Sequence, residues 1–125
     1  MLKSIGCRTW AIADGHVPLA SHGKEPVFTS HDKLCILNTS TREAELDLTV
    51  YYADAEPDGP YALKVAPRRV RHVRVNDLID PRAIPLDVPY GLVIVSTVDI
   101  VVQFSRRDTS QGENAIMTTL AYPVA

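Results

Sequence analysis

The fold is decided by residues 51–78, YYADAEPDGPYALKVAPRRVRHVRVNDL, which predict a tight hairpin followed by a basic strand. In Pro57-Asp58-Gly59, proline presets φ for the first turn position while Asp and Gly tolerate tight or left-handed geometry, so we expect the chain to reverse there. Apolar and polar residues alternate on both sides of this turn, which is the period of a strand that buries one face. The apolar positions are Leu46, Leu48, Val50 and Tyr52 before the turn, and Tyr61, Leu63 and Val65 after it.

The strand after the hairpin carries basic side chains on both faces. Val73 and Val75 share one face with Arg69 and Arg71. The other face holds Val70 together with Arg68, His72 and Arg74. Either a bulge near Pro67 resets the phase, or one face leaves the core part-way along and meets a ligand, a partner subunit or solvent. A solvated edge strand protected by its charges is the simpler interpretation, and a binding surface is the alternative.

The rest of the chain reads as short strands separated by turns. They are expected at residues 7–13, 31–38, 91–98, 100–104 and 115–122, with a break near Asp99 and a polar loop at 105–114. A helical turn at 76–78 cannot extend because Pro81 and Pro85 follow it. Residues 1–125 are therefore expected to form a single all-β domain, a sandwich of about seven or eight antiparallel strands with Greek-key or jelly-roll connections and at most one short helical turn.

Composition limits the classes of function. A net charge of −2 over 125 residues argues against a dedicated nucleic-acid-binding domain, which is usually basic throughout. Residues 1–15 lack the apolar core of a secretory signal, and the apolar run at 92–102 is too short to span a bilayer, so we expect a cytoplasmic protein. Cys7 and Cys35 are too few for a disulfide framework and are expected to be reduced, buried thiols.

Short motifs along almost the whole chain carry a family resemblance. They are Ser4-Ile5-Gly6, Trp10-Ala11-Ile12-Ala13, Glu25-Pro26, Ser30-His31, Cys35-Ile36-Leu37-Asn38, Tyr51-Tyr52, Glu56-Pro57, Gly59-Pro60-Tyr61, Pro67-Arg68-Arg69, His72-Val73-Arg74, Asn76-Asp77-Leu78, Ile84-Pro85, Val101-Val102-Gln103, Arg106, Asp108, Gln111, Glu113-Asn114-Ala115 and Ala121-Tyr122. In these motifs the chain resembles the sensory rhodopsin transducer family, whereas the loop at 16–24 differs from the rhodopsin-linked pattern.

The resemblance implies a small β-sandwich that assembles as a homotetramer. In the best-known member of the family the partner is the cytoplasmic face of a membrane-embedded rhodopsin. For relatives without a rhodopsin, the resemblance implies a small polar ligand, such as a carbohydrate. DNA binding is a further implication, drawn from the rhodopsin-linked member. A fold shared with a family fixes architecture better than it fixes function.

One set of residues offers the chemistry for binding a polar ligand or a partner. Arginine and carboxamide groups form bidentate hydrogen bonds, and a tryptophan face stacks on apolar ring surfaces. The candidates are Trp10, His31, Arg69, Arg71, Arg106, Asp108, Gln111, Glu113 and Asn114. The alternative interpretation makes Trp10 a core residue and pairs Arg106 with Asp108 at a strand end. We expect the 106–114 loop and the Arg69/Arg71 face to border one site, within a chain or at a subunit boundary.

Other chemistries find little support in the sequence. The spacing of His16, His22 and His31 matches no compact zinc site, so no metal and no other cofactor is expected. No nucleophile elbow, paired acids or phosphate-binding glycine loop is present, so we expect no enzyme. The sequence thus predicts a non-enzymatic signalling protein that relays a signal by binding and shifting populations. The alternatives are a DNA-binding regulator using the basic strand, and a small-molecule-modifying enzyme.

Overall fold

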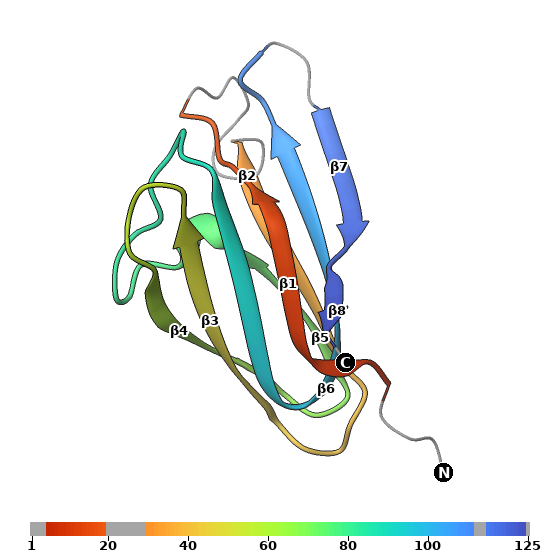
Figure 1. Ribbon diagram of the computed structural model, residues 1–125. Helices are drawn as coiled ribbons and strands as arrows, with labels where there is room; N and C mark the ends of the chain where they lie inside the picture. Colours follow the sequence, from red (N-terminus) through yellow and green to blue (C-terminus); the bar gives the residue numbers. More distant parts are fainter. Residues whose placement is uncertain (1–4, 20–29, 112–114, 125) are drawn as a thin grey trace.

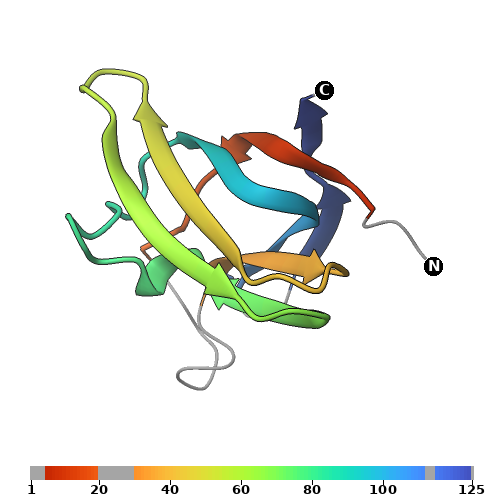
Figure 2. The same ribbon diagram turned by 90° about the horizontal axis from the view of Figure 1, so that it is seen from below.

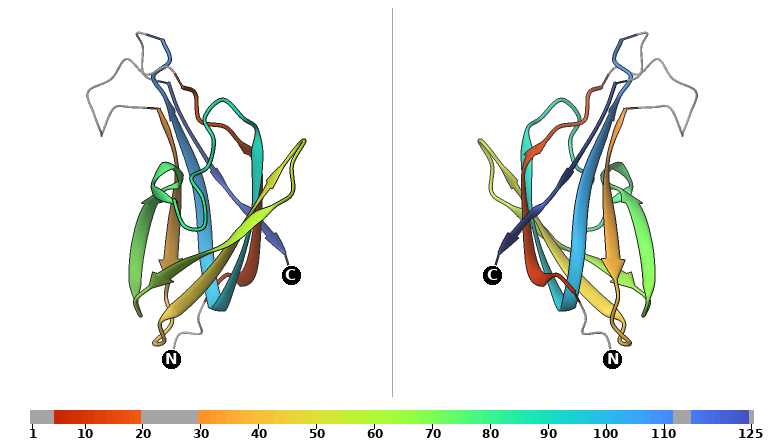
Figure 3. Two further views of the ribbon diagram at one scale, coloured as in Figure 1. Left: turned by 90° about the vertical axis from the view of Figure 1, so that its left-hand side faces the viewer. Right: turned by 90° about the vertical axis from the view of Figure 1, so that its right-hand side faces the viewer.

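The structure is a computed structural model that describes residues 5–19, 30–111 and 115–124. Within these residues, eight antiparallel strands form two facing layers (Figures 1 and 3), which confirms the predicted all-β fold. The elements are β1 (Cys7–Gly15), β2 (His31–Asn38), β3 (Ala44–Tyr52), β4 (Asp58–Val65), β5 (Arg69–Arg74), the 3₁₀ turn η1 (Val75–Asp77), β6 (Tyr90–Asp108), β7 (Ala115–Leu120) and β8 (Tyr122–Val124). The described part of the chain contains no apolar helix of the length that a bilayer requires.

The long strand β6 belongs to both layers. Its first arm lies between β1 and β3 in the layer ordered β4-β3-β6-β1-β8. Its second arm lies between β2 and β7 in the other layer, where β5 is the outer neighbour of β2. Figure 1 shows the cyan arm running down and the blue arm running back up, with a bend at the foot of the molecule. At this bend the pairing with β1 jumps from Ile100 to Val95.

The break expected near Asp99 corresponds to this bend, but the expected division into two strands is wrong. Strand pairing continues through the bend, so residues 90–108 form one strand. The expected loop at 105–114 is also too long, because residues 105–108 pair with β2 and β7. The last strand, expected at 115–122, is divided at Ala121, which is buried and donates its N–H to the Val102 carbonyl oxygen.

The predicted hairpin is confirmed as β3 and β4, but the chain reverses at residues 53–57, because Asp58 and Gly59 already belong to β4 and Asp58 pairs with Val50. These strands pair antiparallel, and the alternating residues Leu46, Leu48, Tyr61 and Leu63 are buried as expected. Gly59 lies at φ +147°, and a Cβ there would be 2.8 Å from the Leu48 carbonyl oxygen, so glycine is required at the start of β4. Figure 2 shows the tip of this hairpin projecting on the side of the molecule away from the C-terminus.

The structure of β5 decides between the bulge near Pro67 and the face that leaves the core part-way along, the two alternatives that the sequence left open. It pairs with β2 from Arg74 to Arg69 without a register shift, so no bulge resets its phase. Val73 is buried whereas Arg69 and Arg71 on the same face are exposed. One face therefore leaves the core part-way along. Among the described strands β2 is the only neighbour of β5, so β5 is an edge strand.

Candidate functional site

One end of the sandwich contains a buried ionic cluster built on Asp32. The Asp32 side chain is fully buried at the start of β2. Its Oδ2 accepts hydrogen bonds from the Tyr90 hydroxyl at 2.5 Å and from the His16 backbone N–H at 3.0 Å. Its Oδ1 accepts one from Arg106 Nε at 3.0 Å. The carboxylate therefore joins the ends of β1, β2 and both arms of β6, and its charge is balanced by the guanidinium.

Arg106 connects this cluster to the surface. Its Nη2 donates to the Asp14 carbonyl oxygen at 2.6 Å, and its Nη1 lies 3.8 Å from the Asp14 carboxylate. Burial lowers the pKa of Arg106, but hydrogen bonding to Asp32 and the charge of Asp32 outweigh it, so the pKa is raised overall. Burial also raises the pKa of Tyr90, and the charge of Asp32 adds to this effect. The guanidinium therefore stays charged and the phenol stays neutral, as the Asp32 contacts require.

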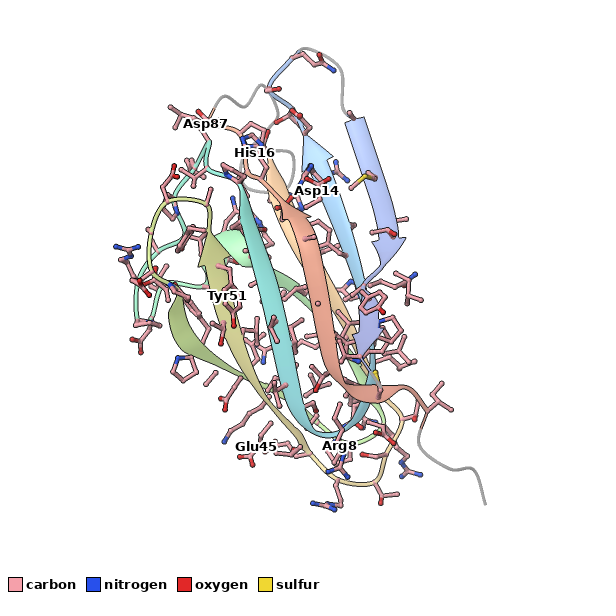
Figure 4. All side chains as sticks on the ribbon, viewed as in Figure 1. Arg8, Asp14, His16, Glu45, Tyr51 and Asp87 are labelled. Atoms are coloured by element: carbon pink, nitrogen blue, oxygen red, sulfur yellow. The ribbon has the colours of Figure 1, made fainter. Side chains whose placement is uncertain are left out.

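The rim of the same end carries further charged groups. Figure 4 shows Asp14, His16 and Asp87 gathered there. His16 Nε2 lies 3.9 Å from Asp87 Oδ1, which also accepts the Leu19 backbone N–H at 2.9 Å. Hydrogen bonds from the Ser110 side chain and backbone hold the pKa of Asp108 below its ordinary value. Most of these polar groups are bonded to other groups of the protein. We therefore interpret this end as a structural cluster that holds the strand ends together, and not as an open binding site.

A groove of about 500 Å³ lies between β4 and β5, along edges with which no other described strand pairs. Its floor is made of buried apolar side chains, chiefly Leu63, Val73 and Leu78. Arg71 closes one end by donating from Nη1 to the Lys64 carbonyl oxygen at 2.7 Å. The other end is lined by residues 77–80, which include two exposed aspartates. The groove thus combines apolar side chains with basic residues of β5 and with the carboxylates of Asp77 and Asp80.

The structure separates the predicted site residues into three places. Trp10 lies in the core, 3% exposed, where its indole N–H donates to the carbonyl oxygens of Cys7 and Ile100. The ionic end holds the residues at the start of β2 and at the end of β6, namely His31, Arg106, Asp108 and the exposed Gln111. The basic edge strand carries Arg69 and Arg71. Glu113, Asn114 and His22 lie outside the described residues.

Among the described residues of one chain, the Arg69/Arg71 face does not border Arg106, with which it was expected to share a site. Along β2, Arg69 pairs with Asn38 whereas Arg106 pairs with Asp32. At about 3.4 Å per residue, these positions lie roughly 20 Å apart along the strand. Strand β2 also separates β5 from β6. Among the described residues no group of three or more histidine, cysteine, aspartate or glutamate side chains is arranged to hold a metal.

The centre of the ionic cluster was not among the residues predicted from the sequence. The sequence predicts a strand at 31–38, which begins beside Asp32, and assigns no role to Asp32, Tyr90 or Asp14. One signal was available, because the alternation in residues 31–38 places Asp32 on the same face as Leu34 and Ile36. A charged residue on a buried face requires a partner of opposite charge or several hydrogen-bond donors. The identity of those partners was not available from local spacing.

Comparison with known proteins gives a consistent picture. The family model described as Anabaena sensory rhodopsin transducer matches residues 5–123. A crystal structure described as Thermotoga maritima 1070 superposes with a TM-score of 0.85 at 31% sequence identity, covering 95% of this chain and 96% of that chain. The structure described as Anabaena sensory rhodopsin transducer superposes with a TM-score of 0.74 at 48% identity, covering 82% of this chain and 97% of that one. Comparison with curated proteins gave no match.

Proposed function

Because the chain belongs to the sensory rhodopsin transducer family, we propose that it is a homotetrameric, cytoplasmic signalling protein that acts by binding and not by catalysis. The observation that carries this proposal is the family match over residues 5–123. The free thiols of Cys7 and Cys35 are compatible with a reducing compartment. Membership of a transducer family supports a signalling role and leaves the partner to be identified.

The groove between β4 and β5 is the binding surface that we propose. Both flanking strands have an unpaired edge there, so an extended segment of a partner or a small polar ligand can reach backbone donors and acceptors. Arg71 and Arg74 line the groove with guanidinium groups, and Asp77 and Asp80 line it with carboxylates. Such a surface binds a ligand with several hydroxyl groups, for example a carbohydrate, or a protein segment with both charge signs.

A binding experiment with a matched pair of variants tests this surface. Ala62 is exposed and lines the groove, so Ala62→Trp fills it without removing a contact. Ala66→Trp places the same bulk on an exposed position outside the groove. A panel of neutral and charged monosaccharides, titrated into ¹⁵N-labelled protein, should shift the amides of 61–65 and 71–80. We expect Ala62→Trp to weaken that binding at least about tenfold and Ala66→Trp to preserve it. Ligand-induced shifts at 105–111 instead would move the proposed site to the ionic end.

A rhodopsin in the membrane is the proposed partner if the monosaccharides do not bind. The support is the 48% identity to a protein described as the transducer of a sensory rhodopsin. Detergent-solubilised rhodopsin encoded by the same genome would be the probe, in a pull-down with the Ala62→Trp and Ala66→Trp proteins. Retention of the second protein and loss of the first is the expected result. If both the Ala62→Trp and the Ala66→Trp proteins are retained, rhodopsin binds to a surface other than the groove.

Nucleic-acid binding is a second candidate, favoured by the basic edge strand β5. Arg69 and Arg71 are exposed, yet Arg71 donates to the Lys64 carbonyl oxygen and Arg69 to the Arg68 carbonyl oxygen. Guanidinium groups engaged with backbone are less available for phosphates, and the net charge of −2 opposes binding to a polyanion. Mobility-shift assays across a range of salt concentrations decide the matter. Binding that survives about 0.15 M salt would favour the regulator.

A further inference from the structure

A second cavity lies apart from the β4–β5 groove, between the end of β3 with the turn that follows it and the loop that precedes β6. Its volume is about 160 Å³. Pockets for drug-sized ligands measure roughly 300–1,000 Å³, so this cavity holds only a small molecule. It is lined by Tyr52, Ala53, Asp54 and Ala55 on the first side and by Arg82, Pro85, Val88 and Pro89 on the second.

The walls of this cavity are mainly apolar. Most of the residues that line it are alanine, proline or valine. Proline fixes the backbone angle φ, so Pro85 and Pro89 limit the conformations of the loop that forms one wall. A wall that is already ordered before a ligand arrives costs less entropy on binding. The cavity is therefore suited to a short aliphatic group.

Two groups of opposite charge line the same cavity. Asp54 is exposed on the turn after β3, and the side chain of Arg82 is 59% exposed on the loop. Because the cavity is small, both charged groups are within reach of one small ligand. A few polar groups placed around an apolar wall fix the orientation of a ligand and make its binding specific.

Arg82 is held in place by the β3–β4 hairpin. Its Nη2 and Nε lie 2.8 and 3.0 Å from Asp58 Oδ2, and its carbonyl oxygen accepts a hydrogen bond from the Tyr61 hydroxyl at 2.5 Å. The hydrogen bond to Asp58 raises the pKa of Arg82, so the guanidinium stays charged. A guanidinium has five N–H donors and Asp58 occupies two of them, so Arg82 retains donors for a ligand.

We propose that this cavity binds a free α-amino acid with an apolar side chain. The carboxylate of the ligand pairs with Arg82, its ammonium group pairs with Asp54, and its side chain lies against the alanine, proline and valine wall. Both charged groups of an α-amino acid are attached to one carbon atom, so their partners must line the same small cavity. The site goes beyond the proposed function, because it shares no lining residue with the β4–β5 groove and takes a ligand of another class.

The charge of the surrounding segments favours a zwitterion. Residues 51–61 and 76–90 contain a single basic residue, Arg82, and six acidic residues. The acidic residues are Asp54, Glu56, Asp58, Asp77, Asp80 and Asp87. This excess of negative charge repels an anion that has no ammonium group, and a simple amine would bring its charge close to Arg82 with nothing to pair with the guanidinium. A zwitterion has no net charge and pairs with both groups.

Titration of ¹⁵N-labelled protein with L-leucine tests the site. Both ion pairs lie near solvent, so we expect weak binding, with a Kd on the order of 1 mM, and shifts of the amides of 52–55 and 82–88. Three control ligands each lack one group, since N-acetyl-L-leucine has no ammonium group, L-leucinamide has no carboxylate and glycine has no side chain. We expect each of them to bind at least about tenfold more weakly than leucine. A control ligand that binds as tightly as leucine would refute the contact assigned to the missing group.

A matched pair of variants tests the role of Asp54. Asp54→Asn removes the proposed partner of the ammonium group, whereas Glu56→Gln removes a carboxylate of the same turn that does not line the cavity. Both side chains are exposed, so the circular dichroism of both variants should be unchanged. We expect Asp54→Asn to weaken leucine binding at least about tenfold and Glu56→Gln to preserve it. Arg82 is tested through leucinamide, because replacing Arg82 would also remove its contact with Asp58.

The outcomes separate this site from the β4–β5 groove. An absence of shifts at 52–55 and 82–88 up to about 20 mM leucine refutes the amino-acid site and leaves the groove untouched. Leucine-induced shifts at 61–65 and 71–80 alone would place leucine in the groove and refute the cavity as its site. Equal weakening of leucine binding by Asp54→Asn and Glu56→Gln would show an effect of overall charge and refute the contact with Asp54.

Discussion

Replacing Asp32 by Asn tests the idea that the ionic cluster holds one end of the sandwich together. The substitution keeps the shape of the side chain and removes its charge. The carboxylate now accepts hydrogen bonds from three donors, on Tyr90, His16 and Arg106. An amide has one acceptor oxygen, so its NH₂ group must face at least one donor. That leaves an unsatisfied buried group, which costs about 1–3 kcal/mol.

The loss of charge gives a second, larger estimate that already includes this cost. Breaking a buried ion pair by removing one partner typically costs about 3–5 kcal/mol, because the remaining charge is uncompensated. Arg106 is 18% exposed and also donates to the Asp14 carbonyl oxygen, so part of its charge is stabilised elsewhere. We therefore expect Asp32→Asn to lower the free energy of unfolding by about 3 kcal/mol, at the low end of that range.

Urea unfolding followed by circular dichroism measures the effect. With a slope of about 2 kcal/mol per molar urea, the transition midpoint should fall by about 1.5 M. All proteins must be compared at one concentration, because assembly contributes to apparent stability. Asp99→Asn is the control, since Asp99 and Arg8 are 3.8 Å apart and exposed, and such pairs contribute less than about 1 kcal/mol. Equal, small losses in the two variants would refute the reasoning.

Three further predictions concern the same end of the molecule. Burial raises the pKa of Tyr90, so the stability that the neutral phenol contributes is present below the ordinary tyrosine pKa of about 10 and is lost as the pH rises above it. In urea titrations at increasing pH, Tyr90→Phe should therefore lose less stability at alkaline pH than the wild type. Ser110→Ala should raise the pKa of Asp108 towards its ordinary value, as followed by the carboxyl ¹³C shift. The stability that Asp108 contributes should then be lost at a higher pH than in the wild type. An unchanged pKa would contradict the assigned cause. Gly15→Ala should cost at least about 2 kcal/mol in thermal unfolding, because a Cβ there would lie 2.3 Å from the Tyr90 ring; a fully stable variant would show that the ring can move.

The parts of the fold that could be predicted are those set by residues close together in the sequence. Strand β2 and the β3–β4 hairpin follow from period-two alternation, and both are confirmed, although the turn lies at residues 53–57 and not at 57–59. The continuity of β6 was not predictable, because pairing through the bend depends on which strands lie on each side. Asp99 looked like an interruption, yet it lies within the continuous strand.

The ionic cluster was hidden for a related reason. The three donors to Asp32 are 16, 58 and 74 residues away along the chain. No local pattern links them. Arg69 and Arg71 do not meet Arg106 within one chain, because β2 separates β5 from β6, and this depends on the strand order. The sequence identified arginine and carboxamide side chains that are able to bind a ligand. Where those side chains lie on the surface depends on the strand order, which the sequence did not predict.

The bend of β6 has a spectroscopic consequence. Trp10 is the single tryptophan of the chain, and its indole N–H is bonded to the Ile100 carbonyl oxygen at the point where β6 passes from one layer to the other. Its emission maximum and quenching should therefore respond first to any loosening of the seam between the layers, even when all strands persist. Trp10 therefore serves as an intrinsic fluorescent reporter for the bend of β6, the segment that connects the two layers.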